Sequence, residues 1–268
     1  MTIALSPPAR PFSAVRHPGM LAVASGKGGV GKTWLSITLA HALARSGRRT
    51  LLFDGDLGLA NVDIQLGLMP AHDLSAVISG RLALPDALIP YTPGGFDIIA
   101  GRSGCGRLAN VPQTRLTSLS DSLAALAADY DHVILDLGAG IERTVRYLAD
   151  RVNTCVVVTS DEPTALTDAY AFIKVTHGEG SVRDLRIVVN MAASLREGER
   201  TYGSLRKACE GFLKISPPLL GIIRRDPKVR ESIRHQMPTL IRFPHSEAAE
   251  DVEKIAQRLG QPDATARP

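Results

Sequence analysis

The sequence lacks the features that mark secreted, disulfide-stabilised or membrane-spanning proteins. Its three cysteines, Cys105, Cys155 and Cys209, are odd in number, widely separated and without metal-ligand spacing. We therefore expect reduced thiols in a cytoplasmic protein, with Cys155 in the core. No apolar run reaches the roughly 18–20 residues that span a bilayer. The first eleven residues contain one arginine and three prolines but no apolar segment, so no secretory signal is expected.

Charge and length set broad limits on the kind of protein. The net charge is +4, the hydrophobic content is 44%, and the chain has 268 residues. This length suits one large α/β domain with a proper core. The mild positive charge permits weak association with nucleic acid or anionic lipid without requiring either.

Apolar strand-like runs alternate with helical patterns from residue 20 onward. This alternation predicts a single three-layer α/β domain over 20–260, with a mostly parallel twisted sheet of about seven or eight strands and helices on both faces. A flexible leader (1–19) and a flexible tail (261–268) are expected at its ends. Strands are predicted at 20–25, 49–54, 96–100, 131–136, 153–159, 184–190 and 219–223. Helices are predicted near 31–46, 73–79, 112–129, 141–150, 163–177, 198–214, 227–235 and 246–259.

Residues 26–33 match the phosphate-loop pattern G-x-x-x-x-G-K-[ST] in full. An apolar run precedes them and a helical pattern follows, which is the order that phosphate binding needs. Lys32 is expected to contact the β- and γ-phosphates and Thr33 to ligate Mg²⁺. The predicted ligand is therefore a nucleoside triphosphate with magnesium. The predicted nucleotide-binding residues here are Gly26, Lys27, Gly28, Gly29, Val30, Gly31, Lys32, Thr33 and Trp34.

Two further predicted strands end in carboxylates. One leads into Asp54 and Asp56, and another into Asp136. Because ligands sit at the carboxyl ends of parallel strands, both clusters should face the phosphate loop. One carboxylate there is expected to hold magnesium and another to orient or deprotonate the attacking water. For any single aspartate, a helix cap or turn role is the competing interpretation.

Three segments resemble the MinD/ParA family of ATPases: KGGVGKT at 27–33, DGDLGLANVD at 54–63 and DLGAGI at 136–141. The resemblance runs from about residue 20 to about residue 259. Within the MinD-like branch, the DLGAGI run looks most like the FlhG group (also named FleN or YlxH), whose members govern flagellar number and placement. The fold that this resemblance implies is the phosphate-loop NTPase fold, which agrees with the three-layer α/β domain predicted from the pattern of strands and helices.

The resemblance implies roles for individual residues. Lys27 would be the signature lysine that crosses to the partner subunit, and Asp56 would position the hydrolytic water, so Lys27, Lys32 and Asp56 form the expected catalytic set. Thr33, Asp54 and Asp136 would hold Mg²⁺. Asn190 would contact the adenine base, and Asp226 belongs to the family's base-proximal loop.

The sequence also departs from the family pattern. Arg224 stands where a proline is usual, and Trp34 stands where a second polar residue is usual. The last predicted helix, 246–259, is acidic at its start, which favours packing on the sheet over binding to an anionic membrane. The glycine-rich loop 101–107 is expected to lie on the surface near the dimer face without a catalytic role.

The resemblance predicts a slow, partner-stimulated ATPase that forms a homodimer with ATP and regulates flagellar number or placement. Its expected partner is a protein of the flagellar machinery. The alternatives are a ParA-like partitioning ATPase that binds DNA through the basic stretch 224–234 and a MinD-like regulator of the division site. A metal-cluster carrier is disfavoured because no C-x-x-C pair is present. A metabolic ligase or amidotransferase on the same scaffold would need further catalytic groups, which the sequence does not indicate. Peripheral attachment to the inner membrane stays open, although no clear anchor is visible.

Overall fold

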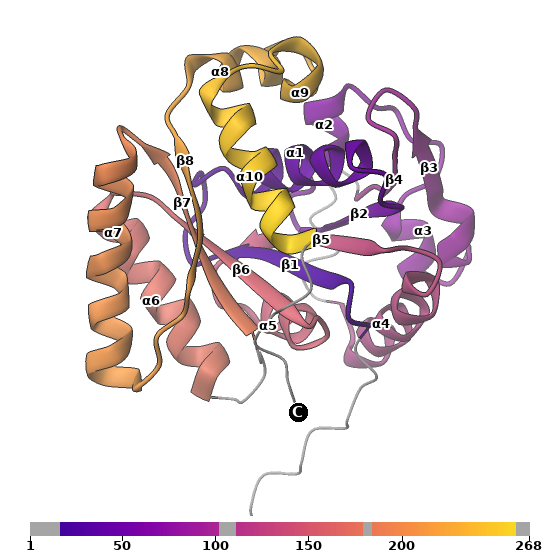
Figure 1. Ribbon diagram of the computed structural model, residues 1–268. Helices are drawn as coiled ribbons and strands as arrows, with labels where there is room; N and C mark the ends of the chain where they lie inside the picture. Colours follow the sequence, from indigo (N-terminus) through magenta and orange to yellow (C-terminus); the bar gives the residue numbers. More distant parts are fainter. Residues whose placement is uncertain (1–16, 102–110, 179–183, 261–268) are drawn as a thin grey trace, which may run out of the picture.

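One mostly parallel sheet organises the molecule (Figure 1). The structure, a computed structural model, describes residues 17–101, 111–178 and 184–260. Within these ranges eight strands follow the order β3-β4-β2-β5-β1-β6-β7-β8. β3 runs antiparallel to β4, and all other neighbours are parallel. The strands are β1 Met20–Ser25, β2 Thr50–Gly55, β3 Leu88–Tyr91, β4 Phe96–Ile99, β5 His132–Ala139, β6 Thr154–Thr159, β7 Asp184–Ala192 and β8 Leu219–Arg224.

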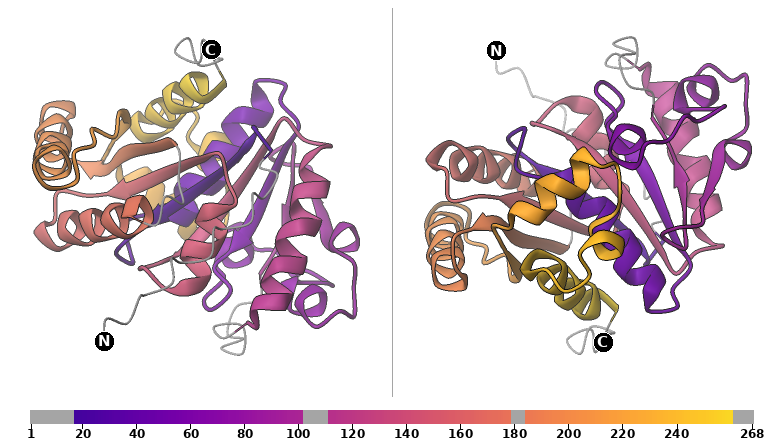
Figure 2. Two further views of the ribbon diagram at one scale, coloured as in Figure 1. Left: turned by 90° about the horizontal axis from the view of Figure 1, so that it is seen from below. Right: turned by 90° about the horizontal axis from the view of Figure 1, so that it is seen from above.

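Helices cover both faces of this sheet, which confirms the predicted three-layer α/β fold (Figures 1 and 2). α1 and α10 pack on one face, and α4, α5, α6 and α7 pack on the other. The α-helices are α1 Lys32–Arg45, α2 Val62–Leu66, α3 Leu74–Ile78, α4 Gln113–Ala127, α5 Arg143–Asp150, α6 Pro163–Gly178, α7 Leu195–Ala208, α8 Pro227–Arg234, α9 Thr239–Arg242 and α10 Glu247–Gly260. A short 3₁₀ helix spans Leu84–Ala87, and a π-helical turn, Cys209–Leu213, continues α7.

The central strands are apolar throughout because both of their faces are buried. In β1, Met20 and Ala22 point into the core under α4 to α7, whereas Leu21 and Val23 point into the core under α1 and α10. Side chains of a strand alternate between the two faces, so a strand between two helical layers has no polar face. Cys155 of β6 is fully buried, as predicted.

The sequence prediction missed several short elements. The edge strand β3 contains Pro90, and proline is tolerated in a sheet at such edges. α7 begins earlier than predicted because Ser194 caps it, accepting a hydrogen bond from the Glu197 N–H at 3.2 Å. The expected leader and tail lie outside the described residues except for 17–19, which turn into β1. Most of the 101–107 loop, with Cys105, also lies outside the described residues.

The last helix packs on the sheet, as its acidic start predicted. Ala248, Val252 and Ile255 of α10 are buried beside α1 and β8. Among the helices that the structure describes, none combines the length and hydrophobicity needed to cross a bilayer.

Buried His41 gives the fold a specific sensitivity to acid. Burial, aided by the charge of Arg45, lowers the pKa of His41 from 6.5 to about 4. Its Nδ1 atom has no hydrogen-bond partner, and its ring lies beside Phe96. Between pH 6.5 and about pH 4, His41 is therefore protonated in the unfolded chain but not in the folded chain. The free energy of unfolding falls as the pH is lowered through this range.

We expect His41→Leu to remove this part of the acid sensitivity. Because the pKa of His41 is lowered on folding, this residue should lower the free energy of unfolding of the wild-type protein by about 2 kcal/mol at pH 5 relative to pH 8. Urea unfolding at the two pH values measures the difference. An unchanged pH slope in His41→Leu would contradict the assignment.

Candidate functional site

The phosphate loop connects β1 to α1 at the carboxyl edge of the sheet. Gly29 and Gly31 have φ angles of 81° and 89°, in the left-handed region that glycine adopts without strain. α1 then begins at Lys32 without a side-chain cap and without an acidic residue in its first turn. By contrast, Asp226 caps α8. The first N–H groups of α1 thus keep their capacity to bind an anion.

Ser25, at the end of β1, holds both lysines of the loop. Its hydroxyl donates a hydrogen bond to the Lys27 carbonyl at 2.6 Å and accepts one from the Lys32 ammonium at 3.0 Å. Burial lowers the pKa of Lys32, while the charges of Asp136 and Asp56 oppose that shift. Sequence reasoning missed Ser25 because its role depends on the loop curling back over the strand end.

We expect Ser25→Ala to weaken nucleotide binding about fivefold, because the Lys27 carbonyl and the Lys32 ammonium both lose a buried partner. Calorimetric titration with Mg-ATP measures this change. Ser46→Ala is the matched control, since Ser46 donates to the Leu43 carbonyl at the opposite end of α1. Equal affinities in Ser25→Ala and wild type would show that Ser25 does not shape the loop.

The two acidic strand ends meet as predicted. Asp54 and Asp136 are directly paired on β2 and β5, and each is almost fully buried. Burial raises the pKa of both carboxyls above the usual range, and the charge of Asp136 adds to the shift at Asp54. Such a concentration of buried carboxylates favours the approach of a cation.

The two carboxylates have different neighbours. Asp136 accepts a hydrogen bond from the Ser36 hydroxyl at 2.9 Å, and interaction with Thr33, the predicted magnesium ligand, partly opposes the rise in its pKa. Asp54 instead accepts N–H groups of the following loop, from Asn61 at 3.2 Å and Val62 at 3.1 Å. Asp54 therefore shapes the 56–62 segment. No sequence pattern indicated Ser36, which reaches Asp136 from a position one turn into α1.

Asp56 faces a cavity of about 790 Å³ together with Lys32 and Thr33. Its walls come from the phosphate loop and from the segments that follow β2 and β5. A methyl group at Gly138 would lie 3.3 Å from the Asp56 carboxyl group, so the two segments pack closely. Asp56 also accepts the Leu59 N–H at 2.9 Å, which orients its carboxylate.

Lys27 does not line this cavity. Its ammonium lies 2.5 Å from the Glu162 carboxylate and 2.7 Å from the Thr164 hydroxyl, at the start of α6. The Lys27 side chain is 33% exposed and that of Glu162 is 63% exposed. The two lysines of the loop therefore point to different places, one into the site of its own chain and the other to the surface.

The remaining predicted residues are distributed around the loop. Trp34 lines the cavity, and its indole N–H donates to the Thr239 hydroxyl at 2.8 Å. Asn190, on β7, donates from its amide to the Val30 carbonyl at 2.8 Å. Asp226 lies farther out, where it accepts N–H groups of Lys228 and Ala248. Asn190 thus touches the phosphate loop, whereas both carboxylate oxygens of Asp226 have backbone partners.

These residues fit a magnesium nucleotide. The loop offers an ammonium and an uncapped helix start for phosphate, and Thr33 with the nearby carboxylates offers the oxygen ligands that Mg²⁺ prefers. The cavity lies in the range of small-molecule sites. Fold and site together define a phosphate-loop nucleotide-binding protein.

Comparisons with known proteins are consistent with this class. Residues 21–240 match the model of the CobQ/CobB/MinD/ParA nucleotide binding domain. The antiactivator FleN of Pseudomonas aeruginosa is 37% identical over 91% of this chain and 87% of its own length. The flagellum site-determining protein YlxH of Helicobacter pylori is 29% identical over 89% of this chain and 81% of its own. The septum site-determining protein MinD of Pyrococcus horikoshii, complexed with Mg-ADP, superposes with a TM-score of 0.77 at 25% identity, covering 90% of this chain and 96% of that one.

The chain therefore belongs to the MinD/ParA family of nucleotide-binding ATPases. The family resemblance seen in the three sequence motifs is confirmed, and so is the phosphate-loop fold.

Proposed function

We propose that the chain binds ATP with Mg²⁺ and hydrolyses it slowly, as a switch between monomer and dimer. Lys32 and the N–H groups of the loop hold the phosphates, with Gly26 to Trp34 as the surrounding segment. Thr33 ligates Mg²⁺, and Asp136 and Asp54 support it from behind the cavity wall. Bound Mg-ATP supplies the scissile phosphate bond, and Asp56 orients the attacking water. The Mg-ADP complex of the Pyrococcus MinD supports the choice of ligand.

The position of Lys27 is the main observation that supports the proposed ATP-dependent dimer. The chain's own cavity does not use this ammonium, which stays at the surface on the exposed Glu162. In the proposed dimer each Lys27 leaves Glu162 and binds the phosphates in the other protomer, where charge-assisted hydrogen bonds are strong. After hydrolysis Lys27 loses its anionic partner in the other protomer, and the interface opens.

The proposed output is control of flagellar number or placement from the cytoplasm, through a protein of the flagellar machinery. Similarity to the Helicobacter YlxH, named as a flagellum site-determining protein, supports this role, as does the greater similarity to FleN. Counting flagella per cell in a strain without the gene tests it. We expect the number or position to change and to be restored by the wild-type gene. Normal flagella together with misplaced division septa would favour the MinD-like role instead.

A ParA-like role in DNA partitioning has weaker support. Of the basic stretch, Arg225, Lys228 and Arg230 are exposed, but Arg224 is bound by carboxylates of α10. A DNA-binding switch would show ATP-dependent DNA affinity that falls steeply with salt. Affinity that is weak and independent of ATP would exclude this role.

A further inference from the structure

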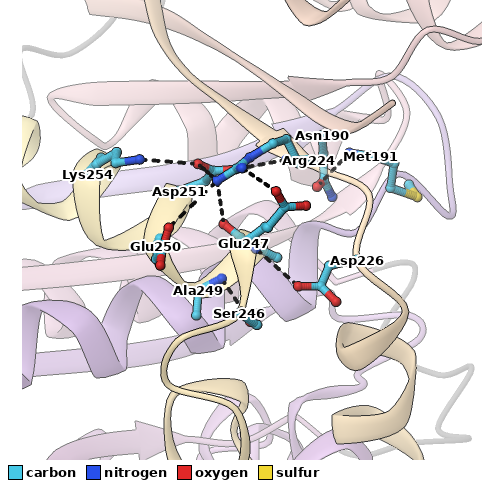
Figure 3. Close-up of polar contacts among 11 residues, drawn as sticks. Asn190, Met191, Arg224, Asp226, Ser246, Glu247, Ala249, Glu250, Asp251 and Lys254 are labelled. Carbon is cyan, nitrogen blue, oxygen red and sulfur yellow. Dashed lines mark hydrogen bonds and ion pairs between the residues drawn. The ribbon is translucent and has the colours of Figure 1, made fainter. Parts of the chain in front are cut away.

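A cluster of ionic contacts joins the end of β8 to the start of α10 (Figure 3). The Arg224 guanidinium binds Asp251 side-on, with Nε 2.8 Å from one carboxylate oxygen and Nη2 2.9 Å from the other. The Arg224 backbone N–H also donates to Asp251 at 3.1 Å. Glu247 receives a third guanidinium hydrogen bond at 2.5 Å. Bidentate pairing of this kind fixes orientation as well as distance.

The pair is sheltered from solvent. The Asp251 side chain is 2% exposed and that of Arg224 is 20% exposed. Removing Arg224 would leave the buried Asp251 carboxylate with only the exposed Lys254 ammonium, at 3.7 Å, as a cationic partner, which is costly. The end of β8 is thereby fixed to a helix that packs against α1, the helix of the phosphate loop.

From Arg224 the contacts continue to the phosphate loop. The next residue, Arg225, donates its N–H to the Ala192 carbonyl at 2.8 Å and its Nε to the Met191 carbonyl at 3.4 Å. Met191 has a φ of 58°, an unfavourable value for a residue with a side chain, so its neighbours must hold it there. The adjacent Asn190 reaches the Val30 carbonyl. Its amide nitrogen would lie only 2.4 Å from a methyl group at position 31.

The strained end of β7 lies on the side of the phosphate loop away from the three carboxylates. The sheet order places β5 and β2 on one side of β1, and β6, β7 and β8 on the other. Asp54, Asp56 and Asp136 lie on the first side and attract the magnesium-bearing end of a triphosphate. The nucleoside, at the opposite end of the phosphate chain, would then extend toward β7 and β8.

We propose that Arg224 and Asp251 are positioning residues for the nucleoside. They fix the 224–225 segment, and through it Asn190 and Met191 at the end of β7, beside the phosphate loop. The inference rests on the nucleotide binding assigned under the proposed function. It goes further in proposing that the contact between Asp251 of α10 and Arg224 influences how tightly the nucleoside part of the ligand is bound.

The test compares two ligands in calorimetric titrations with magnesium. ATP engages both parts of the site, whereas inorganic triphosphate engages only the phosphate loop. Arg224→Gln should weaken ATP binding about tenfold and triphosphate binding about twofold at most, since the nucleoside side is displaced and the phosphate loop is reached only through the contact of Asn190 with Val30. Arg224→Lys should restore part of the ATP affinity, because a lysine keeps the charge but not the bidentate geometry.

Glu253→Gln is the matched control. Glu253 pairs with Arg45 at 3.1 Å and joins α10 to α1 at the end far from Asn190. Glu253→Gln should change neither the affinity for ATP nor the affinity for triphosphate. The proposal is overturned if Arg224→Gln binds ATP like wild type, or if ATP and triphosphate lose affinity equally. Because monomers suffice for these titrations, a wild-type chain that binds ATP without dimerising would refute the dimer switch while leaving this result interpretable.

Discussion

Lys27→Ala should abolish ATP-dependent dimerisation while leaving nucleotide binding almost intact. Each dimer would lose two charge-assisted contacts, and we expect the dimer dissociation constant to rise about a hundredfold or more. The nucleotide affinity of the monomer should change little, because Lys27 is held by Glu162 and Thr164 outside the cavity. Sedimentation velocity with Mg-ATP measures the first effect and calorimetry the second.

The matched control for this prediction is Lys207→Ala, which removes an exposed lysine from α7. Its dimerisation should equal that of wild type. If Lys27→Ala dimerises at the same protein concentrations as wild type, Lys27 does not bind the phosphates of the other protomer. Complete loss of nucleotide binding would instead place Lys27 in the site of its own chain.

Asp56→Ala should separate dimerisation from turnover. The carboxylate faces the cavity beside Lys32 and Thr33 and is oriented by the Leu59 N–H. Without it the attacking water has no acceptor, and we expect kcat to fall about a hundredfold or more. The dimer should then persist in ATP, because the phosphates that Lys27 binds are not removed. Phosphate-release assays and sizing over time measure the two effects.

The informative control is Asp63→Ala, which removes another carboxylate of the same segment outside the cavity. Its turnover should resemble that of wild type. If Asp56→Ala hydrolyses ATP at the wild-type rate, Asp56 has no part in orienting the water. If Asp56→Ala stays monomeric in ATP, the proposed order of dimerisation before hydrolysis is wrong.

Local patterns were sufficient to predict the centre of the site. The phosphate loop is a continuous motif, and Asp54 and Asp136 follow apolar strands whose carboxyl ends share one edge of a parallel sheet. Their meeting on β2 and β5 could therefore be predicted from the order of elements alone. A different pattern, an apolar side combined with an acidic start, predicted that α10 packs on the sheet.

Contacts between distant residues could not be predicted in this way. Lys27 and Glu162 are separated by 135 positions, and no periodic pattern connects them. The sequence predicted that Arg224 belongs to a basic stretch, but in the folded chain it pairs with Asp251 of α10. Short elements such as β3 were missed because four residues carry too little periodicity and Pro90 argues locally against a strand.

A crystal structure of the chain with Mg²⁺ and a non-hydrolysable ATP analogue tests the central claim most directly. We expect two protomers face to face, with each Lys27 released from Glu162 and within about 3 Å of the other protomer's γ-phosphate oxygens. A monomer with the analogue bound and Lys27 still paired with its own Glu162 would contradict it.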